Sequence, residues 1–340
     1  MLRALGERLA IGEVPRPAPG PGEVLVETRA CGLCGTDLHI CDGLAYVPRL
    51  PHIPGHEPAG VVAELGAGVT GLRAGDRVVP HLFVTCGTCD YCRSGRDAQC
   101  TGVKGILGVL MPGALAEYFT IPAANLFVLP DSIPFAIGGL IADAVLTALH
   151  ASRRARLGVG ETAVVLGAGG VGQCLIQTLV AAGVRVIAVD TTAEKRESAA
   201  ALGAALALPA GDEENARAIR EFADGQGAQA VFECVGKAET MAQAASYLRR
   251  GGQIIVIGEE PEFPRIDTIQ LAQRELEIIG SRNGSRRDLR DAIRFVAAGL
   301  IRPRIARTFP LDEINEALAF FRAGCDGRVV ITIKDYDPGE

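Results

Sequence analysis

The pattern of apolar and polar residues changes character part-way along this chain of 340 residues. Up to about residue 130, short apolar stretches broken by Gly and Pro are typical of β-strands joined by loops. The strands predicted here are Glu23 to Thr28, Gly60 to Leu65, Arg77 to Pro80 and Ala116 to Ile121. We therefore expect an all-β, loop-rich unit.

From Glu161 onward, apolar strands alternate with helical stretches. The predicted strands are Ala163 to Leu166, Val184 to Val189, Ala205 to Leu208, Ala230 to Cys234, Gln253 to Ile257 and Glu275 to Ile279. Helices are expected after Gly172 and around Ala193 to Leu202. Six strands in βα alternation predict an α/β domain with a doubly wound parallel sheet.

Beyond about Ser281 the alternation ends. A helix near Arg287 to Ala298, a second near Leu311 to Arg322 and a strand at Arg328 to Ile333 are predicted there. We expect these elements to return to the β-rich domain, which would then be discontinuous. The predicted division is a β-rich domain of residues 1–145 and 282–340, with the doubly wound domain at 146–281.

Composition narrows the class of partner. The net charge is -6 and the Lys and Arg residues are scattered, which argues against a nucleic-acid binder. Residues 1 to 30 show no secretory signal pattern, and no apolar stretch of about 18 residues suggests a membrane span. We expect a cytoplasmic protein with reduced thiols that acts on a small molecule.

A cluster of cysteines carries the first metal signal. Cys86, Cys89, Cys92 and Cys100 follow the spacing C-x2-C-x2-C-x7-C. Four thiolates this close together are typical of a closed tetrahedral zinc site, which is structural because it leaves no position for substrate. The alternative, unrelated or disulfide-bonded thiols, is disfavoured because cytoplasmic thiols stay reduced and a chain of this length needs no staple.

Cys34 and His56 form a second metal signal. A thiolate combined with an imidazole suits zinc with an open fourth position. Spacing alone does not choose the third ligand. The candidates by chemistry are His39, His52, His81, His150, Glu57 and Asp143. For His52, His81 and His150 a hydrogen-bonded structural role is favoured, because most isolated histidines have one.

A glycine run, Gly167-Ala-Gly-Gly-Val-Gly172, directly follows an apolar strand and opens a helix. Gly167, Gly169 and Gly172 allow a tight turn and close approach of the backbone to a pyrophosphate, and the helix N-terminus offers its amides to the phosphates. Asp190 closes the next strand, where a carboxylate accepts from both ribose hydroxyls and repels a 2'-phosphate. This favours NAD over NADP; the alternative is that Asp190 only caps the following helix.

The order of motifs is informative as a whole. Gly32-Leu-Cys-Gly-Thr-Asp-Leu-His39, Pro54-Gly-His-Glu57, Gly75-Asp-Arg-Val78, the four cysteines and the glycine run follow one another along nearly the whole chain. In this order they resemble the zinc-dependent medium-chain alcohol dehydrogenases. The resemblance implies a GroES-like catalytic domain, a Rossmann domain, two zinc ions per chain and NAD. It also implies a homo-oligomer, either a dimer or a homotetramer.

The resemblance assigns roles around the catalytic zinc. Cys34 and His56 correspond to two ligands, and Asp143 stands where other members place Cys, Glu or Asp as the third. An aspartate there is similar to the carboxylate-ligand type of bacterial and archaeal members. Glu57 corresponds to an acidic neighbour that approaches the metal during ligand exchange, and Asp37 to the carboxylate that orients the ligand histidine.

It also assigns a proton relay. Thr36 corresponds to the hydroxyl that contacts the substrate oxygen, and His39 to the far end of a relay through the nicotinamide ribose. In such a site zinc lowers the pKa of the alcohol, the carbon delivers a hydride to the nicotinamide, and the proton needs a way out. The residues alone leave a structural role for His39 equally open.

The cofactor contacts follow from the same resemblance. The expected cofactor-binding residues include the whole glycine run with Gly170. Val171, within this run, and Thr147 stand where the family packs the nicotinamide ring. Lys195 stands beside the adenosine ribose, and Arg328 where an arginine reaches the pyrophosphate. Each has a plain alternative as core or solvated surface. Gly35 departs from members that carry a basic residue at that position.

The substrate pocket is placed only by analogy. Its expected lining is Leu44, Tyr46, Phe83 and residues 106–111, which are mainly apolar. This favours reversible oxidation of a primary or secondary alcohol to an aldehyde or ketone. Two alternatives remain: a polyol or threonine-type dehydrogenase with the same site, and a non-catalytic NAD-binding scaffold or redox sensor.

Overall fold

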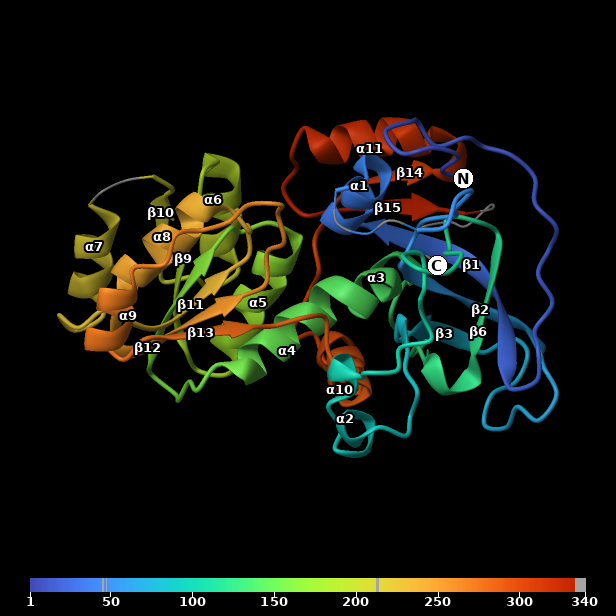
Figure 1. Ribbon diagram of the computed structural model, residues 1–340, viewed down its shortest axis with the longest axis horizontal. Helices are drawn as coiled ribbons and strands as arrows, with labels where there is room; N and C mark the ends of the chain where they lie inside the picture. Colours follow the sequence, from blue (N-terminus) through green and yellow to red (C-terminus); the bar gives the residue numbers. More distant parts are fainter. Residues whose placement is uncertain (45, 47, 212–213, 334–340) are drawn as a thin grey trace. The chain divides into compact units, whose positions relative to one another are not determined.

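The computed structural model describes residues 1–44, 46, 48–211 and 214–333. The chain splits into two compact units (Figure 1). The first unit contains Met1–Leu146, Ser285–Gly299 and the chain from Ile305; the second contains Thr147–Gly284 and Leu300–Arg304.

The first unit is built on a mainly antiparallel sheet of seven described strands. Its order is β14 (Ile305–Pro310), β15 (Arg328–Thr332), β1 (Glu23–Leu33), β2 (Glu57–Leu65), β3 (Arg77–Pro80) and β7 (Leu126–Val128), with β6 (Tyr118–Pro122) paired to β1. The four predicted strands fall on β1, β2, β3 and β6. Two short strands, β4 (Phe83–Val84) and β5 (Gly105–Ile106), form a separate pair.

Strand β1 is the centre of this sheet, because β15, β2 and β6 all pair with it antiparallel. Its side chains Val24 and Val26 lie in the core with Phe119 of β6, while Leu33 joins the same core near the end of the strand. The end of β1 therefore lies deep in the unit, where Gly32 is paired with Glu57 and with Val330.

The first unit is β-rich but not all-β as expected: helix α1 (Gly35–Asp42) follows β1 directly, and the short helix α2 (Asp90–Arg93) lies further along. Cys34 caps α1: its Sγ accepts the Thr36 amide, and Asp37 in turn accepts the Cys34 amide. Gly43 ends it in the left-handed conformation, with φ of 70°. The signal was hidden because a thiol stands where a capping box usually has Ser or Thr.

A continuous helix runs from Phe135 to Arg154 as α3 (Phe135–Leu140), the π-helical segment η3 (Ile141–Val145) and α4 (Leu146–Arg154). This helix has 20 residues. Among the described residues it is the one helix that is long and apolar enough to cross a membrane. Its most apolar window is 78% buried, as in a core helix. It lies tightly on β2, because a Cβ on Gly139 would come within 2.6 Å of the Glu57 carbonyl oxygen.

The second unit is the predicted doubly wound parallel sheet, and this prediction is confirmed. Its order is β10 (Leu206–Pro209), β9 (Arg185–Asp190), β8 (Thr162–Leu166), β11 (Ala228–Glu233), β12 (Leu248–Val256) and β13 (Glu277–Gly280). All neighbouring strands are parallel. The order reverses beside β8, where sheets of this kind bind ligands at the carboxyl ends of their strands.

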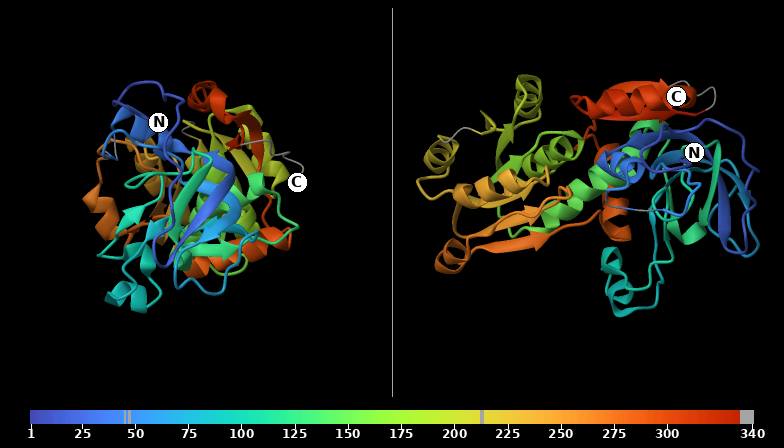
Figure 2. Two further views of the ribbon diagram at one scale, coloured as in Figure 1. Left: turned by 90° about the vertical axis from the view of Figure 1, so that its right-hand side faces the viewer. Right: turned by 45° about the horizontal axis from the view of Figure 1, so that its top comes forward.

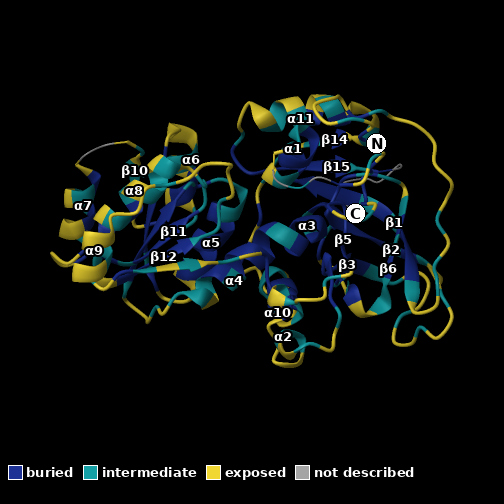
Figure 3. Cartoon of the chain, viewed as in Figure 1, coloured by how far each residue is buried: buried dark blue, intermediate teal, exposed yellow. Residues whose placement is uncertain are grey.

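Helices complete the second unit. Helices α5 (Gly170–Ala181) and α6 (Ala193–Ala201) pack along β8, β9 and β10. Helix α8 (Ala238–Tyr247) packs against β8, β11 and β12 and against α7 (Asn215–Phe222), and α9 (Thr268–Gln273) precedes β13. Figure 2 shows the helices of this unit, coloured green to orange, beside its strands. The central strands β8, β9 and β11 are largely buried, whereas the helices expose their outer sides (Figure 3).

The third part of the chain contains α10 (Arg286–Ala297), β14, the 3-10 turn η4 (Leu311–Glu313), α11 (Ile314–Arg322) and β15. The sequence pattern did not predict β14. Leu300–Arg304 groups with the second unit, although residues 282–340 were assigned to the first domain. The reason is two long-range hydrogen bonds that the sequence pattern does not reveal. The Arg302 amide donates to Gln177 Oε1 over 2.8 Å, and Arg304 Nη1 donates to Ser198 Oγ over 2.7 Å.

Candidate metal centres and dinucleotide site

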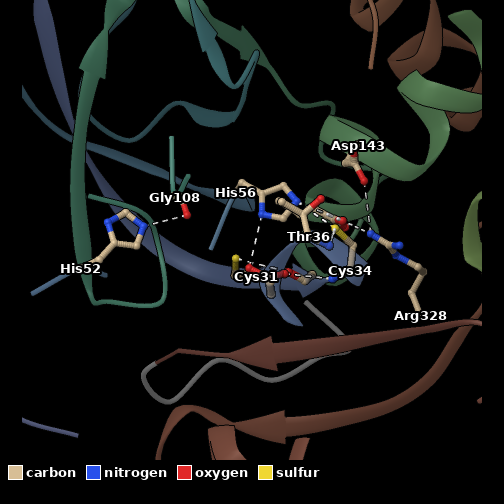
Figure 4. A network of polar contacts seen from close by, with 11 residues as sticks. Cys31, Cys34, Thr36, His52, His56, Gly108, Asp143 and Arg328 are labelled. Atoms are coloured by element: carbon tan, nitrogen blue, oxygen red, sulfur yellow. Dashed lines mark hydrogen bonds and ion pairs between the residues drawn. The ribbon is translucent and has the colours of Figure 1, made fainter. Parts of the chain in front are cut away.

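Four potential ligands of a metal converge in the first unit (Figure 4). The ligand atoms of Cys34, His56, Glu57 and Asp143 all lie within 4.8 Å of one another, and Cys34 Sγ is 3.0 Å from His56 Nε2. Cys34 follows the end of β1, His56 and Glu57 lie at the start of β2, and Asp143 projects from η3. A π-helical segment widens the helix locally and is frequent at functional sites.

Asp37 contacts two of these groups from the first turn of α1. One carboxylate oxygen accepts the Cys34 amide over 3.0 Å, and the other lies 3.4 Å from His56 Nδ1. Burial alone would lower the pKa of His56, but Cys34 and Asp37 outweigh it and raise this pKa well above its ordinary value. The surroundings of His56 therefore favour a positive charge, which either a proton or a metal cation can supply.

Arg328 at the start of β15 is a further charged group beside this cluster. Its side chain is 5% exposed, its Nη2 contacts Glu57 Oε1, and the same nitrogen lies 3.5 Å from Asp143 Oδ2. Burial lowers the pKa of this guanidinium, while Cys34, Asp37 and Cys31 oppose the shift. No local sequence pattern predicts these contacts. Binding of a pyrophosphate by Arg328 stays a prediction.

These residues fit a zinc ion. A thiolate, an imidazole and a carboxylate that reach one point form a donor set that zinc prefers. Of the six third-ligand candidates, Glu57 and Asp143 join the cluster. His52 Nε2 instead bonds the Gly108 carbonyl over 3.0 Å, and His81 Nδ1 lies 3.3 Å from the Phe83 carbonyl. His150 lies on α4, half-buried.

The four-cysteine lobe forms a second cluster, around α2 (Asp90–Arg93) and the 3-10 turn η1 (Asp97–Gln99). Sγ of Cys86 is 3.5 Å from that of Cys100 and 3.9 Å from that of Cys92, and no disulfide joins them. Backbone amides of Thr88 and Cys89 lower the pKa of Cys86 to about 5, whereas burial and neighbouring thiols raise that of Cys92 to about 12. A divalent cation would ionise the whole set.

Thr36 and His39 lie three residues apart on α1, so they share one side of the helix. The Thr36 amide donates to Cys34 Sγ over 3.3 Å, which holds Thr36 beside the metal cluster (Figure 4). His39 is 8% exposed in the last turn. The helix thus connects the cluster with a histidine one turn away.

The glycine run forms the turn between β8 and α5. Gly167 has φ of 89°, and a Cβ on Gly172 would lie 2.0 Å from the Gly167 carbonyl oxygen, so neither tolerates a side chain. Asp190 ends β9 beside this turn: one carboxylate oxygen accepts the Ala168 amide over 2.8 Å, and the other accepts the Thr192 amide over 3.0 Å. Asp190 therefore supports both the glycine loop and the start of α6.

The remaining predicted cofactor residues lie around this turn or at the start of the unit. Gly170 and Val171 open α5, Lys195 is in the first turn of α6, and Thr147 is buried on α4. Sequence reasoning missed Arg196, whose guanidinium donates to the carbonyls of Asp190 and Thr191 over 3.0 Å. Its place next to Lys195 was the available signal.

Comparison with known proteins gives the family. Residues 20–131 match the model of the alcohol dehydrogenase GroES-like domain, and residues 170–298 match that of the zinc-binding dehydrogenases. An alcohol dehydrogenase of Geobacillus stearothermophilus is 38% identical over 96% of each chain. The chain belongs to the zinc-dependent alcohol dehydrogenase family. This confirms the predicted family and its GroES-like and Rossmann folds.

Two further members show the breadth of the family. The structure of the alcohol dehydrogenase from the archaeon Aeropyrum pernix has a TM-score of 0.91 at 31% identity and covers 97% of this chain and 98% of its own. The 2-dehydro-3-deoxy-L-galactonate 5-dehydrogenase of Pseudoalteromonas atlantica is 33% identical over 89% of each chain. Members with different substrates therefore lie at similar distances from this protein.

Proposed function

We propose that this member of the family oxidises a primary or secondary alcohol reversibly to an aldehyde or ketone, with NAD as cofactor and zinc in both clusters. The observation that carries the proposal is the convergence of Cys34, His56 and Asp143 beside Thr36. When bound there, zinc supplies a Lewis acid and NAD accepts the hydride.

The protein's own residues position these groups and move the proton. Asp37 faces Nδ1 of His56, so that Nε2 is directed at the metal position. Thr36 accepts the proton of the alcohol and passes it toward His39, which lies on the same side of α1. An imidazole can accept a proton on one ring nitrogen and release one from the other, so His39 can pass the proton on to solvent.

Preference for NAD is supported by Asp190. Its carboxylate lies beside the glycine turn, where a ribose hydroxyl is a favourable partner and a 2'-phosphate would be repelled. In this proposal the glycine run and Arg328 hold the pyrophosphate, Lys195 flanks the adenosine ribose, and Val171 and Thr147 pack on the nicotinamide ring.

A simple alcohol is supported by the apolar surroundings expected for the substrate. Phe83 and Ile106 are buried in the core of the first unit, and Tyr46 and Met111 pack against that core. A polyol-type substrate is the second candidate, because the relative from Pseudoalteromonas is named for a sugar-acid substrate. A non-catalytic scaffold is disfavoured, because such a protein needs neither Asp143 in the cluster nor Thr36 beside it.

We also propose a homo-oligomer, a dimer or a tetramer, in the cytoplasm. Strand β13 is at the edge of its sheet, and an edge strand can pair with a second copy. Ile278 on β13 is 37% exposed, and nearby in sequence Ile269 and Phe263 are 66% and 95% exposed. Light scattering on the native protein and on Ile278→Lys tests this: we expect a dimer or tetramer that the charge disrupts, and a native monomer would exclude the proposal.

The function is tested by one activity screen. Primary and secondary alcohols, aldehydes, ketones, polyols and threonine are each offered with NAD and with NADP, and zinc per chain is measured in the same preparation. We expect NAD-linked turnover of simple alcohols. Faster turnover of polyols or threonine would select the second candidate, and no turnover with any substrate at full zinc content would support a scaffold.

A further inference from the structure

A buried glutamate ends the strand next to the glycine turn. Glu233 is the last residue of β11 and pairs with Leu166, the last residue of β8. The amide of Cys234 continues this pairing by donating to the Leu166 carbonyl over 3.0 Å. Glu233 and the start of the glycine run therefore lie at the same carboxyl edge of the sheet. Glu233 is fully buried, and the function proposed above gives it no role.

Uncharged donors hold the Glu233 carboxylate. Its Oε1 accepts the Val235 amide over 2.9 Å and the Thr240 hydroxyl over 2.8 Å. The Gly236 amide lies 3.0 and 2.9 Å from its two oxygens. Hydrogen bonds donated by backbone amides stabilise a carboxylate as the anion. The described hydrogen-bond partners of Glu233 include no cation, so they hold its negative charge in place without neutralising it.

The turn that follows Glu233 is closely packed on two sides. A Cβ on Gly167, the first glycine of the run, would come within 2.8 Å of Val235 Cγ2. A Cβ on Gly258, which follows β12, would lie 2.2 Å from the Gly236 amide nitrogen. The Gly258 amide also donates to the Glu233 carbonyl over 3.0 Å. The carboxylate is therefore held at a fixed place beside the glycine turn.

The place of β11 in the sheet indicates which half of the cofactor this charge faces. In a doubly wound sheet each half binds one mononucleotide of a dinucleotide, and the pyrophosphate lies at the glycine turn. Asp190, at the end of β9, belongs to the adenosine half. Strand β11 lies on the opposite side of β8 and begins the other half (Figure 1). In the proposed NAD complex, Glu233 is therefore on the nicotinamide half.

We propose that Glu233 biases the cofactor site toward the oxidised form of NAD. The inference rests on the proposed use of NAD and deepens it. The nicotinamide ring carries a positive charge in NAD⁺ and none in NADH, whereas the pyrophosphate charge is the same in both. A fixed anion on the nicotinamide half attracts the oxidised ring, and burial limits the screening of this attraction by water. Glu233 thus strengthens binding of NAD⁺ relative to NADH, which favours the direction of alcohol oxidation.

The test compares the dissociation constants of NAD⁺ and NADH in the whole protein loaded with zinc. Glu233→Gln keeps the size of the side chain and removes its charge, whereas Glu233→Asp keeps the charge. We expect Glu233→Gln to shift the ratio of the two constants in favour of NADH by about tenfold. Glu233→Asp should keep the native ratio, although it weakens both cofactors. Calorimetry measures NAD⁺ binding and fluorescence measures NADH binding.

The matched control is Glu239→Gln, which removes an exposed carboxylate from the first turn of α8 and should keep the native ratio. A purely structural role of Glu233 would weaken both forms of the cofactor alike. A native ratio in Glu233→Gln, or an equal change of the ratio in Glu233→Asp, would therefore overturn the proposal.

ADP-ribose, which lacks the nicotinamide, reports on the rest of the site and should bind Glu233→Gln as it binds the native protein. If that variant does not fold, Thr240→Lys decides the matter, because it leaves Glu233 in place and brings an ammonium group beside its carboxylate. Its ratio should shift in the same direction, and an unchanged ratio would contradict the proposal. Failure of the proposed function looks different, because the native protein would then bind neither NAD⁺ nor NADH.

Discussion

The carboxylate of Asp37 lies 3.4 Å from Nδ1 of His56. Because Asp37 also accepts the Cys34 amide, one side chain fixes the backbone of the thiolate ligand and faces the imidazole ligand. Both contacts arise from the first turn of α1, so the cap of a short helix and the geometry of the metal cluster are the same feature.

The first prediction follows from this contact. Asp37→Asn should weaken zinc binding at the Cys34 cluster by about tenfold to a hundredfold, since the uncharged amide raises the basicity of His56 less. The fold should be retained, because Asn still offers an oxygen to the Cys34 amide. Competition with a chromophoric chelator measures the affinity. Asp76→Asn, which alters an exposed turn with Arg73, is the control and should bind zinc normally. Equal zinc affinity in the two variants would show that Asp37 does not contribute to zinc binding.

The second prediction separates the two metals. Cys89→Ser should lower the zinc content and the melting temperature together, because the lobe folds around its metal. Cys34→Ser should abolish turnover and largely spare folding, because Ser replaces the thiol well as the cap of α1. Zinc analysis and thermal unfolding measure both variants. The assignment is wrong if the native protein is fully active with one zinc or none.

Much of the fold could be predicted because most of its strands have a recognisable pattern in the local sequence. The strands of the second unit are continuous apolar stretches between helices, and the runs that predict them overlap all six of its observed strands. Helix α1 could not be predicted in this way, because it is short and its cap is a cysteine. Strand β14 was missed because its alternation is weak: Phe309 is its buried side chain.

The residue types of the metal site could be predicted from the sequence. Which side chains contact one another there could be predicted less well. The spacing of Cys34 and His56 left the third ligand open, because the position of Asp143 depends on how a π-helical turn lies over β2. The contact between Arg328 and Glu57 depends on the pairing of β15, near the end of the described chain, with β1, which in turn pairs with β2. Such tertiary relations have no local signature.

The third prediction concerns cofactor choice. Asp190→Ser should narrow the preference for NAD over NADP, mainly through KM, because it removes the charge that repels a 2'-phosphate. It also removes an acceptor of the Ala168 and Thr192 amides, so it should raise the KM of both cofactors. Asp190→Asn retains one acceptor oxygen and should change the preference with a smaller loss. A native enzyme that already prefers NADP would show that Asp190 does not contact the ribose.

The fourth prediction concerns pH and the pair of Asp42 with Arg322, which are joined by two hydrogen bonds of 2.8 and 2.9 Å. These bonds hold the pKa of Asp42 below its ordinary value. Since the pKa is lower in the folded state, the pair stabilises the protein above the unfolded pKa of about 3.9 and loses this contribution as the pH falls through the folded pKa.

The side chains of this pair are 29% and 55% exposed, so its contribution should be small, about 0.2–1 kcal/mol. Asp42→Asn should lower the free energy of unfolding by this amount at pH 7, and the difference should vanish well below pH 4. Urea unfolding at several pH values measures it. A difference that stays constant with pH would mean that the carboxylate charge is not its source.

The last prediction tests the proton relay along α1. His39→Gln should leave zinc content, fold and cofactor affinity nearly intact while slowing alcohol oxidation by about tenfold to ten-thousandfold, the range of general base catalysis. The loss should shrink as the pH rises or when a buffer base is added, because either can take the proton that His39 no longer accepts. Thr36→Val should be more severe and resist this rescue, since it removes the hydroxyl beside Cys34 that meets the substrate itself. The rates are measured where chemistry limits turnover. An unchanged rate of His39→Gln between about pH 6 and 9 would give His39 a structural role in the last turn of the helix.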